Sequence, residues 1–395
     1  MERPMRRTRW PLFGALALAT CQPGSETVDR AVGTQVELQD VHVVPTPDVL
    51  ARIVDVAPGN DGRVWVLNSV EPFFVLLQTD GQVVRSFGDR GGGPNEFDDP
   101  IKLVRGPDGS TWTFDNLRKS FRSISNPQTP ELALPTDWQL VSFENAGMGM
   151  VATAPWLHSQ GGDFLVARKR PSSPPSGGLG IWHADVYAVA MGPQGLTVER
   201  SLAVPDLVAD PSERWPGATL LVPYPLWAAC AAGGFGLYDP LANTLRRLTS
   251  DGEEEPAFAL GEERNLEVTF DHLFGMVYRL YSELRPGGQA PDSLQMRTAL
   301  QQQFEQVEGA FADDFPAYAD LQCVDDGSFW LQPHVVRDGR FARSSAWTRF
   351  GTDGSRTTIS LPEGFTVHRI ENDRIWGTVV DTLGLPSVAW LTVQQ

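Results

Sequence analysis

The sequence predicts an all-β fold: a six-bladed β-propeller, closed by an N-terminal strand and carrying an inserted helical hairpin between blades four and five. Three observations lead to this prediction. Short β-rich runs separated by Gly-containing turns repeat along the 395 residues. An apolar residue recurs in the second run of each repeat, and the last repeat is one run short. The composition agrees, because 41% hydrophobic residues suffice for a core and 38 glycines suit a chain with many turns.

The first repeat shows the pattern most clearly. It runs from Arg52 to Gly88 and holds four β-rich runs. Its turns include Asn60-Asp61-Gly62 and Asp80-Gly81, where Gly permits the positive φ of a tight hairpin. Aligned on their second run, the six repeats place these residues at one position: Trp65, Trp112, Leu165, Leu237, Trp330 and Trp376. One four-stranded sheet for each repeat is the pattern of a propeller.

The two ends of the repeat region complement each other. The sixth repeat stops after its third run, at 387–393, and a lone β-rich run lies at 34–44. A propeller leaves no sheet edge bare, because an unpaired edge invites other strands. We therefore predict that 34–44 is the outer strand of the sixth blade and that 34–395 form a single domain.

Residues 261–316 interrupt the β pattern. Apolar residues recur at helical spacing over 266–284 and again over 292–311, and a Pro-Gly-Gly break separates the two stretches. This predicts the helical hairpin, with Asp292 or Ser293 capping its second helix. Each helix has an apolar stripe, which must pack against the other helix or against the propeller.

The first 20 residues, 1–20, resemble a signal peptide. A positively charged start precedes a short apolar run at 10–18, which is too short to span a bilayer. Leu18-Ala19-Thr20-Cys21 resembles the lipobox of bacterial lipoproteins, in which the cysteine carries the lipid, although Thr20 departs from the usual Gly, Ala or Ser. The alternatives are an ordinary signal peptide with an incidental cysteine and a twin-arginine signal at Arg6-Arg7.

On this interpretation, residues 21–33 form a linker that begins at a lipid anchor on Cys21. Gln22 resembles the residue that follows the cysteine in lipoproteins of the outer membrane. We therefore expect an exported protein of the bacterial cell envelope, anchored at the outer membrane and facing the periplasm or the cell surface. The lipid is expected to be its only contact with the membrane.

The charge of the chain excludes one class of partner. The net charge is −17 at pH 7, so the phosphate backbone of a nucleic acid is repelled. We expect a monomer that binds neither nucleic acid nor a cofactor. Cys230 and Cys323 each precede a glycine by four residues, at similar places in successive repeats. Export permits a disulfide between them, and two buried free thiols are the alternative.

The segment "FGDRGGGPNEFDDPIKLVRGPDGSTWTFDNLRKSFRSIS" resembles an NHL repeat. Its marks are Phe87-Gly88, the run Gly91-Gly92-Gly93-Pro94, Phe97, Pro100 and the Asp108-Gly109 turn. The whole chain resembles the bacterial exported six-bladed β-propeller lipoproteins with NHL-like repeats, a family largely without assigned activity. The glycine run links two strands, whereas a phosphate-binding loop leads from a strand into a helix. It is therefore predicted to be the crossover from the first blade to the second.

Long segments are expected to gather on one face of the propeller, because links from the second to the third strand and from blade to blade open on the same side. These segments are 88–99, 169–184, 205–218, 261–316 and 333–345. Long loops on a rigid scaffold commonly carry binding sites. The candidate binding residues are Asp89, Arg90, Trp182, His183, His334 and Arg337. This favours a non-catalytic binding or scaffold protein for a protein or glycan partner.

The alternative is a metal-dependent lyase or hydrolase with its site at the central channel. The candidate ligands are His158, His183 and His334, which are expected on the loop-rich face. No pair of histidines has a metal-ligand spacing such as HxH or HExxH, and no Gly-x-Ser-x-Gly stretch exists. We therefore assign no catalytic residue and no metal ligand from the sequence.

Overall fold

The structure is a computed structural model, which describes residues 34–35, 41–59, 61–105, 110–126, 128–129, 131–134, 145–146, 149–150, 158–160, 163–169, 180–192, 195–209, 225–230, 235–240, 242–249, 253–255, 258–260, 266–272, 274–275, 278, 292–306, 314–324, 326–337, 340–371 and 373–393. The predicted signal peptide 1–20, the linker 21–33 with Cys21, and residues 170–179 of the loop 169–184 lie outside this part of the chain. No helix in the described part is long and apolar enough to cross a membrane.

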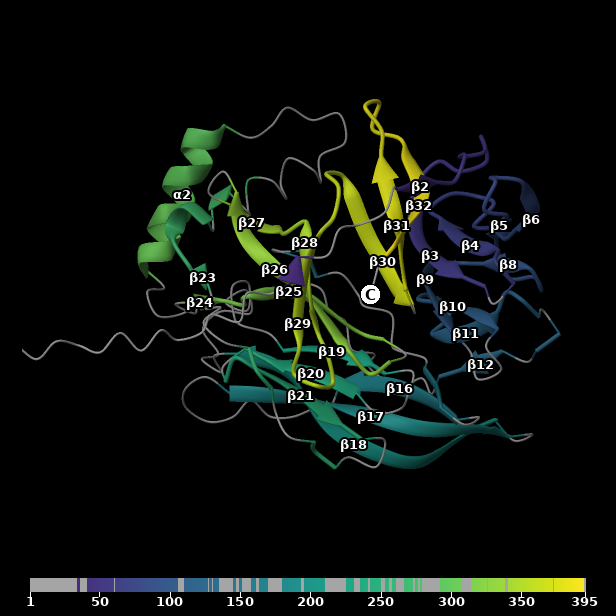
Figure 1. Cartoon of the computed structure of the whole chain (residues 1–395), viewed down its shortest axis with the longest axis horizontal. Helices are drawn as coiled ribbons and strands as arrows, with labels where there is room; N and C mark the ends of the chain where they lie inside the picture. The colour runs from purple at the N-terminus through teal and green to yellow at the C-terminus, as the bar shows by residue number, and fades with distance from the viewer. Residues whose placement is uncertain are drawn as a thin grey trace, which may run out of the picture. The chain divides into compact units, whose positions relative to one another are not determined.

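The described residues are mostly β-sheet, and six of the sheets contain four or more strands (Figure 1). The first two sheets are β3 (Ile53–Pro58), β4 (Val64–Asn68), β5 (Phe74–Leu77) and β6 (Val83–Phe87), then β9 (Pro100–Arg105), β10 (Thr111–Asp115), β11 (Ser120–Ser123) and β12 (Leu132–Ala133). The next two are β15 (His158–Gln160), β16 (Asp163–Lys169), β17 (Gly180–Gly192) and β18 (Gly195–Ala209), then β19 (Leu226–Ala229), β20 (Phe235–Asp239), β21 (Thr244–Leu248) and β22 (Phe258–Ala259).

The fifth sheet contains β25 (Tyr318–Cys323), β26 (Phe329–Arg337), β28 (Ala346–Phe350) and β29 (Arg356–Ser360), with β27 (Arg340–Arg343) paired to β26. The sixth contains β30 (Phe365–Glu371), β31 (Arg374–Val380) and β32 (Pro386–Thr392). Short pairs lie between sheets: β7 (Asp89–Arg90) with β8 (Glu96–Phe97), β13 (Asn145–Ala146) with β14 (Gly149–Met150), and β23 (Leu266–Glu267) with β24 (Asp314–Phe315).

Apolar side chains fill the space between sheets that follow one another in the chain. Every residue of β4 and of β5 is buried, which requires a sheet covered on both faces. Leu67 and Leu103 belong to one hydrophobic cluster, which the first and second sheets share. Tyr238 and Tyr318 belong to another, between the fourth and fifth sheets, and their rings meet edge to face at 5.0 Å.

The sixth sheet packs against both of its neighbours. Trp347 of the fifth sheet and Ile375 of the sixth share one cluster. Val56 of the first sheet and Val388 of the sixth share another, so that the last sheet packs on the first. A propeller is built from sheets stacked in this manner around an axis.

The N-terminal segment differs from the single strand expected over 34–44. It forms two short strands: β1 (Thr34–Gln35) pairs in parallel with β29, and β2 (His42–Val43) pairs antiparallel with β32. The ring of His42 stacks on Trp390 at 4.0 Å, and Val44 donates its N–H to Val388 at 2.8 Å. Two sheets have an open edge here, and one segment covers part of both edges.

The insertion begins and ends with a strand pair. β23 pairs with β24, and α2 (Ser293–Gln306) lies between them in the chain. Asp292 caps α2, since its carboxylate accepts the N–H of Leu294 and of Gln295. The predicted first helix starts later than expected, because 266–267 are extended and helical residues begin at Phe270. Much of α2 is exposed, and its apolar stripe is therefore covered only in part.

Candidate functional site

The first strands of neighbouring sheets lie against one another. β3 contacts β9 on one side and β30 on the other, β9 contacts β15, and β19 contacts β25. A hydrogen bond of 2.8 Å from the N–H of Ile370 to the side chain of Gln322 joins β30 to β25. First strands that contact each other in chain order occupy the innermost position of a propeller-like arrangement.

Charged side chains interrupt three of these apolar strands at the same place. Asp55 in β3 pairs with Leu67, Lys102 in β9 pairs with Phe114, and Asp320 in β25 pairs with Gln332. In each strand, the charged residue lies two positions before the residue that pairs with the aligned tryptophan of the second strand. The charged residue also lies next to a register shift in the pairing. A β-bulge redirects side chains and is common beside functional sites. We call Asp55, Lys102, Asp320, His368 and Arg369 the inner-strand cluster.

Asp55 connects three sheets. Its carboxylate accepts the N–H of Val56 and the N–H of Leu103 in the second sheet, both at 2.9 Å. Lys102 Nζ lies 3.7 Å from one carboxylate oxygen, and His368 Nδ1 in the sixth sheet lies 3.4 Å from the other. Only 2% of the Asp55 side chain is exposed. A buried carboxylate with this many donors is stable as the anion.

The charge state of Asp55 follows from these contacts. Burial alone would raise the pKa of its carboxyl. The charge of Lys102, the hydrogen bond from His368 and the charge of Arg369 outweigh burial and hold the pKa of Asp55 well below its usual range. Arg369 is itself fixed, because its Nη2 donates to Leu103 O at 2.9 Å.

His368 has a partner on each ring nitrogen. Nδ1 lies 3.4 Å from Asp55, and Nε2 lies 3.3 Å from the hydroxyl of Thr378. In the neutral ring both bonds form when Nδ1 donates to the carboxylate and the hydroxyl donates to Nε2. The order Asp–His–Thr matches that of a hydrolase triad. However, Thr378 is only 6% exposed, so this arrangement orients His368 and does not offer a nucleophile to solvent.

The pKa of Asp320 is shifted in the opposite direction to that of Asp55. Burial raises the pKa of its carboxyl, and the charges of Arg343 and Lys102 and the N–H of Leu321 offset this only in part. Arg343 lies 3.9 Å away, and the Leu321 N–H donates at 2.8 Å. The side chain of Asp320 is 32% exposed and that of Lys102 is 49% exposed. Solvent therefore reaches this part of the inner-strand cluster.

The predicted loop 333–345 is a β-hairpin. β26 continues to Arg337 and pairs with β27, with Val335 opposite Ala342. The sequence contains the hairpin signal Asp338-Gly339 at this point. The segment still links the second strand of its sheet to the third, but it does so as paired strand, which satisfies the backbone of both arms. We call residues 334–343 the fifth-sheet extension.

His334 is a structural residue of the fifth-sheet extension. Its N–H donates to Ala317 O at 2.7 Å, its Nδ1 lies 3.0 Å from Pro316 O, and its ring meets Phe315 edge to face at 4.7 Å. Burial lowers the pKa of its imidazole to about 4. The ring is therefore neutral, and it attaches the end of the insertion to β26. Arg337, three residues on, is exposed.

The other candidate binding residues lie on separate elements. Asp89 and Arg90 form β7 and are exposed, and the N–H of Arg90 donates to Glu71 at 3.1 Å. Trp182 and His183 belong to β17, where they pair with Leu207 and Pro205 of β18. The expected loop ends at 180–184 and 205–209 are thus strands of one long hairpin. The candidates come from three elements: β7, β17 and the fifth-sheet extension.

The three candidate metal histidines do not form one site by register. His158 in β15 pairs with Leu165, which pairs with Ala188 in β17, five residues from His183. At about 3.3 Å per residue the two histidines are roughly 16 Å apart along the strands. A metal–nitrogen bond is only about 2 Å long. Within the part of the chain that the structure describes, no group of three or more His, Cys, Asp or Glu residues is suited to a metal ion.

The glycine run of the crossover binds a side chain of its own segment. The carboxylate of Glu96 accepts the N–H of Gly93 at 2.7 Å and fills the space beside Gly91, which has φ +147°. Arg118 donates to Gly91 O and to Asp98. The place that a phosphate would take is thus occupied by a carboxylate, and the segment serves to connect two sheets.

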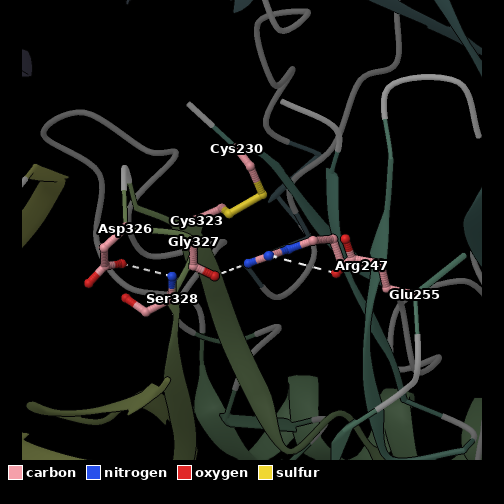
Figure 2. The surroundings of a disulfide bond; sticks show 7 residues. All are labelled: Cys230, Arg247, Glu255, Cys323, Asp326, Gly327 and Ser328. Carbon is pink, nitrogen blue, oxygen red and sulfur yellow. Dashed lines mark hydrogen bonds and ion pairs between the residues drawn. A yellow bond between two sulfur atoms is a disulfide. The ribbon is translucent and has the colours of Figure 1, made fainter. Parts of the chain in front are cut away.

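A disulfide joins the fourth and fifth sheets (Figure 2). Cys230 follows β19 and Cys323 ends β25, and their Cα atoms are 4.9 Å apart. Close by, Arg247 donates to Gly327 O and forms an ion pair with Glu255. Of the two alternatives for these cysteines, the structure has the bridge.

The solved structures that resemble this chain are β-propeller-like proteins. A member of the DUF4221 family from Bacteroides vulgatus has a TM-score of 0.55 and 8% identity, over 91% of this chain and 98% of that one. A presumed exported protein from Bacteroides fragilis has a TM-score of 0.46 and 11% identity, over 93% and 98%. Virginiamycin B lyase from Staphylococcus aureus has a TM-score of 0.40 and 10% identity, over 91% and 100%. No family model and no curated protein matches the sequence.

The inner-strand cluster is not among the predicted site residues, although the sequence contains a signal for it. The repeats were aligned on their second strands, where the tryptophans are. The same alignment brings the first strands into register and places a charged residue at one shared position of three mostly apolar runs: "IVDVAP", "PIKLVR" and "YADLQC". A charge in an innermost strand needs a partner or a ligand, so this aligned position is the clearest sequence signal of a site.

Proposed function

We propose that this chain is a monomeric, lipid-anchored, six-bladed β-propeller of NHL-like type in the bacterial cell envelope. It binds a protein or glycan partner, without catalysis, on its loop-rich face. The six sheets are its blades, and β2 completes the sixth. The packing of the sixth sheet on the first and the pairing of β2 with β32 support a closed ring.

The loop-rich face is supported by the way two additions to the fifth sheet meet. The fifth-sheet extension links a second strand to a third, and the insertion 261–316 links two sheets, so both open on the same side of a ring. β23 of the insertion contacts β26, and His334 fixes the insertion's end through Pro316 and Phe315. The proposal rests on this junction, because it fixes the fifth-sheet extension and the insertion 261–316 to each other. We call these two segments together the platform.

The platform has features of a binding surface. Val336 is 45% exposed, and Arg337 beside it is exposed as well. On the insertion, the guanidinium of Arg297 lies over the rings of Phe270 and Phe274, at 5.2 and 5.1 Å. Arginine and aromatic side chains are enriched where proteins bind one another, and aromatic rings also stack on sugars.

A photo-crosslinking amino acid placed at Arg337 tests this face in intact cells. We expect it to capture an envelope partner. The matched control replaces Asp353, an exposed turn residue between β28 and β29, which opens on the other side of the ring. Equal capture from both positions, or capture from 353 alone, would show that the loop-rich face is not the binding face.

The lipid anchor is tested by Cys21→Ser in the full chain. Without the thiol no lipid can be attached, so the protein should move from the membrane fraction to the soluble fraction. Gln22→Asp is the control. This variant should stay in the membrane fraction but should be found in the other membrane of the cell envelope. Unaltered fractionation of Cys21→Ser would contradict the anchor.

The second candidate is a lyase or hydrolase with its site at the central channel. One observation favours it: Asp55 and Asp320 occupy the same register position and have pKa values shifted in opposite directions, as in acid–base pairs. The purified chain would then hold a stoichiometric metal ion. Metal analysis of the purified protein separates this candidate from pure binding.

A further inference from the structure

A cavity lies between the first and second sheets, where the crossover 88–99 passes from one sheet to the other. Its volume is about 170 Å³, and its walls come from β6, from the crossover with β8, from β11 and from the link between β11 and β12. Liquid water takes about 30 Å³ for each molecule, so the cavity has room for about five or six waters. Sites for drug-sized ligands are larger, at roughly 300–1,000 Å³. The cavity therefore has the size of one ring-shaped group, such as a sugar or an aromatic side chain.

Two phenylalanines form an apolar wall of this cavity. Phe87 ends β6 and Phe97 ends β8, and both line the cavity. Both rings contact the ring of Phe74, with centroids at 5.4 and 4.6 Å. Phe97 is 2% exposed, and Phe87 is partly buried against the same hydrophobic cluster. These contacts hold both rings in place, so the apolar wall is formed before a ligand binds.

Arg122 of β11 holds the crossover against the second sheet and also lines the cavity. Its guanidinium lies over the ring of Phe97, 4.4 Å from the centroid. Nη1 donates to Glu96 O at 2.6 Å, and Nη2 donates to Pro94 O. The side chain of Arg122 is 13% exposed. Each terminal nitrogen carries two N–H groups, so these two bonds leave an N–H on each of them for a ligand.

Three more polar side chains line the cavity and have hydrogen-bonding capacity available: Asn95, Thr129 and Glu131. The Glu131 carboxylate lies 3.6 Å from Nε of Arg122, longer than a hydrogen bond, and its side chain is 38% exposed. Among the described residues, none makes a hydrogen bond with the side chain of Asn95 or of Thr129. The N–H of Thr129 donates to Asn126 O at 3.0 Å, which fixes the link that carries it. The cavity thus combines an apolar wall with unpaired donors and acceptors.

We propose that the cavity between the first and second sheets binds a neutral sugar ring. The apolar C–H face of the sugar packs on the wall formed by Phe87 and Phe97. Arg122 donates to hydroxyl oxygens of the sugar, Glu131 accepts from hydroxyl protons, and the amide of Asn95 does both. The site uses no residue of the platform, so it goes beyond the proposed function and does not rest on it.

The polar side chains favour a neutral sugar over other groups of this size. An anion is repelled by Glu131, and a cation is repelled by Arg122. An aromatic side chain of a partner protein would pack on the phenylalanines. It would also exclude water from Glu131 and Asn95 without replacing their hydrogen bonds, which costs free energy. The hydroxyls of a sugar both donate and accept, so a sugar satisfies the apolar wall and the polar side chains together.

Ligand-observed NMR titration of the full chain tests the site. The detergent must be zwitterionic, because a detergent with a sugar headgroup would compete for the cavity. The probes are the methyl glycosides of glucose, galactose, mannose and N-acetylglucosamine. We expect at least one of them to bind with a Kd on the order of 1 mM, as is typical of so small a ligand.

Two variants assign the binding to this cavity. Glu131→Gln should weaken it by about 5-fold, because a charge-assisted hydrogen bond becomes a neutral one. Asn95→Ala should also weaken it by about 5-fold, through the loss of one neutral hydrogen bond. Both side chains are exposed, so we expect both variants to fold, and their thermal unfolding checks this. Glu363→Gln changes an exposed carboxylate between β29 and β30, and as the matched control it should leave the Kd unchanged.

Three outcomes would overturn the proposal. The first is that none of the four glycosides binds, and the second is that Glu131→Gln and Glu363→Gln have the same effect on the Kd. The third is that p-cresol, which has the structure of a tyrosine side chain, binds more tightly than every glycoside. That result would assign the cavity to an aromatic side chain of a protein partner. The crosslinking experiment at Arg337 has no bearing on these titrations, so the two proposals fail separately.

Discussion

Two aspartates at one register position of their strands differ because their neighbours differ. Asp55 has two backbone donors, Lys102 and His368 around a fully buried carboxylate, and it is stable as the anion. Asp320 has one backbone donor and a cation at 3.9 Å, and burial dominates its pKa. The contrast shows that the number of donors and charges around a carboxyl decides the direction in which its pKa shifts.

Asp55→Asn should be strongly destabilising. The substitution removes the negative charge that Lys102, His368 and Arg369 surround. It also leaves one oxygen for the two backbone N–H groups of Val56 and Leu103, and the loss of one hydrogen bond to a charged group should cost about 1.5–3 kcal/mol. Because the pKa of Asp55 is lowered on folding, its contribution is fully present above the unfolded value near 3.8. It is lost progressively as the pH falls from there through the lower folded value. Urea unfolding at neutral pH should therefore show the loss, and at low pH wild type and variant should converge.

The control for this experiment is Asp353→Asn, which changes a carboxylate in an exposed turn. It should leave the free energy of unfolding almost unchanged at both pH values. Equal effects of the two substitutions would show that Asp55 contributes no more than a surface carboxylate. The sequence could suggest Asp55 only as an odd residue in an apolar strand, because its partners come from 48 and from more than 300 residues away.

The elements that were predicted best are those whose signals are local. Asp-Gly turns predicted hairpins such as the one at Gly81, where φ is +88°, and Asp292 predicted the start of α2. The elements that were missed depend on distant pairing. β1 pairs with a strand that lies more than 300 residues later in the chain. No local pattern of residues reports such a pairing, which depends on which sheet edge is open.

The disulfide that joins β19 and β25 should contribute strongly to the free energy of unfolding. The bridge closes a loop of 93 residues, which in the chain-entropy description stabilises the fold by about 4–5 kcal/mol. Cys230→Ser combined with Cys323→Ser should lower the free energy of unfolding by about this amount. Unfolding of wild type under reducing conditions should give a similar loss, and the double variant should not respond to reductant. A double variant as stable as oxidised wild type would contradict the contribution.

The β class and the propeller-like stacking of the sheets could be predicted because the repeats recur along the sequence. The position of the inner-strand cluster could not be predicted, because it depends on contacts between first strands that lie far apart in the sequence, such as β3 with β9 and β30. His334 is predicted from the sequence as a candidate binding residue and metal ligand, yet its ring holds the insertion to β26. Lys102 was not selected, yet it lies beside Asp55 and is half exposed. In both residues the deciding contacts are between sheets.

Deletion of residues 34–44 tests whether the N-terminal segment stabilises the fold by covering the edges of the fifth and sixth sheets. The deletion takes away β1 and β2 together and leaves the edges of β29 and β32 bare. It also removes Val44, which is 1% exposed and bonded to Val388. The lost burial and hydrogen bonds should cost at least about 3 kcal/mol, and the bare edges should promote self-association.

A shorter deletion, of 34–40, separates the two edges. It removes β1 and keeps β2, so it should cost less than the full deletion and leave the sixth sheet complete. Thermal unfolding and size-exclusion chromatography of the three proteins measure both effects. If the full deletion melts as wild type does and stays monomeric, β2 does not close the ring. If the short deletion is as harmful as the full one, the fifth sheet, and not the sixth, depends on the N-terminal segment.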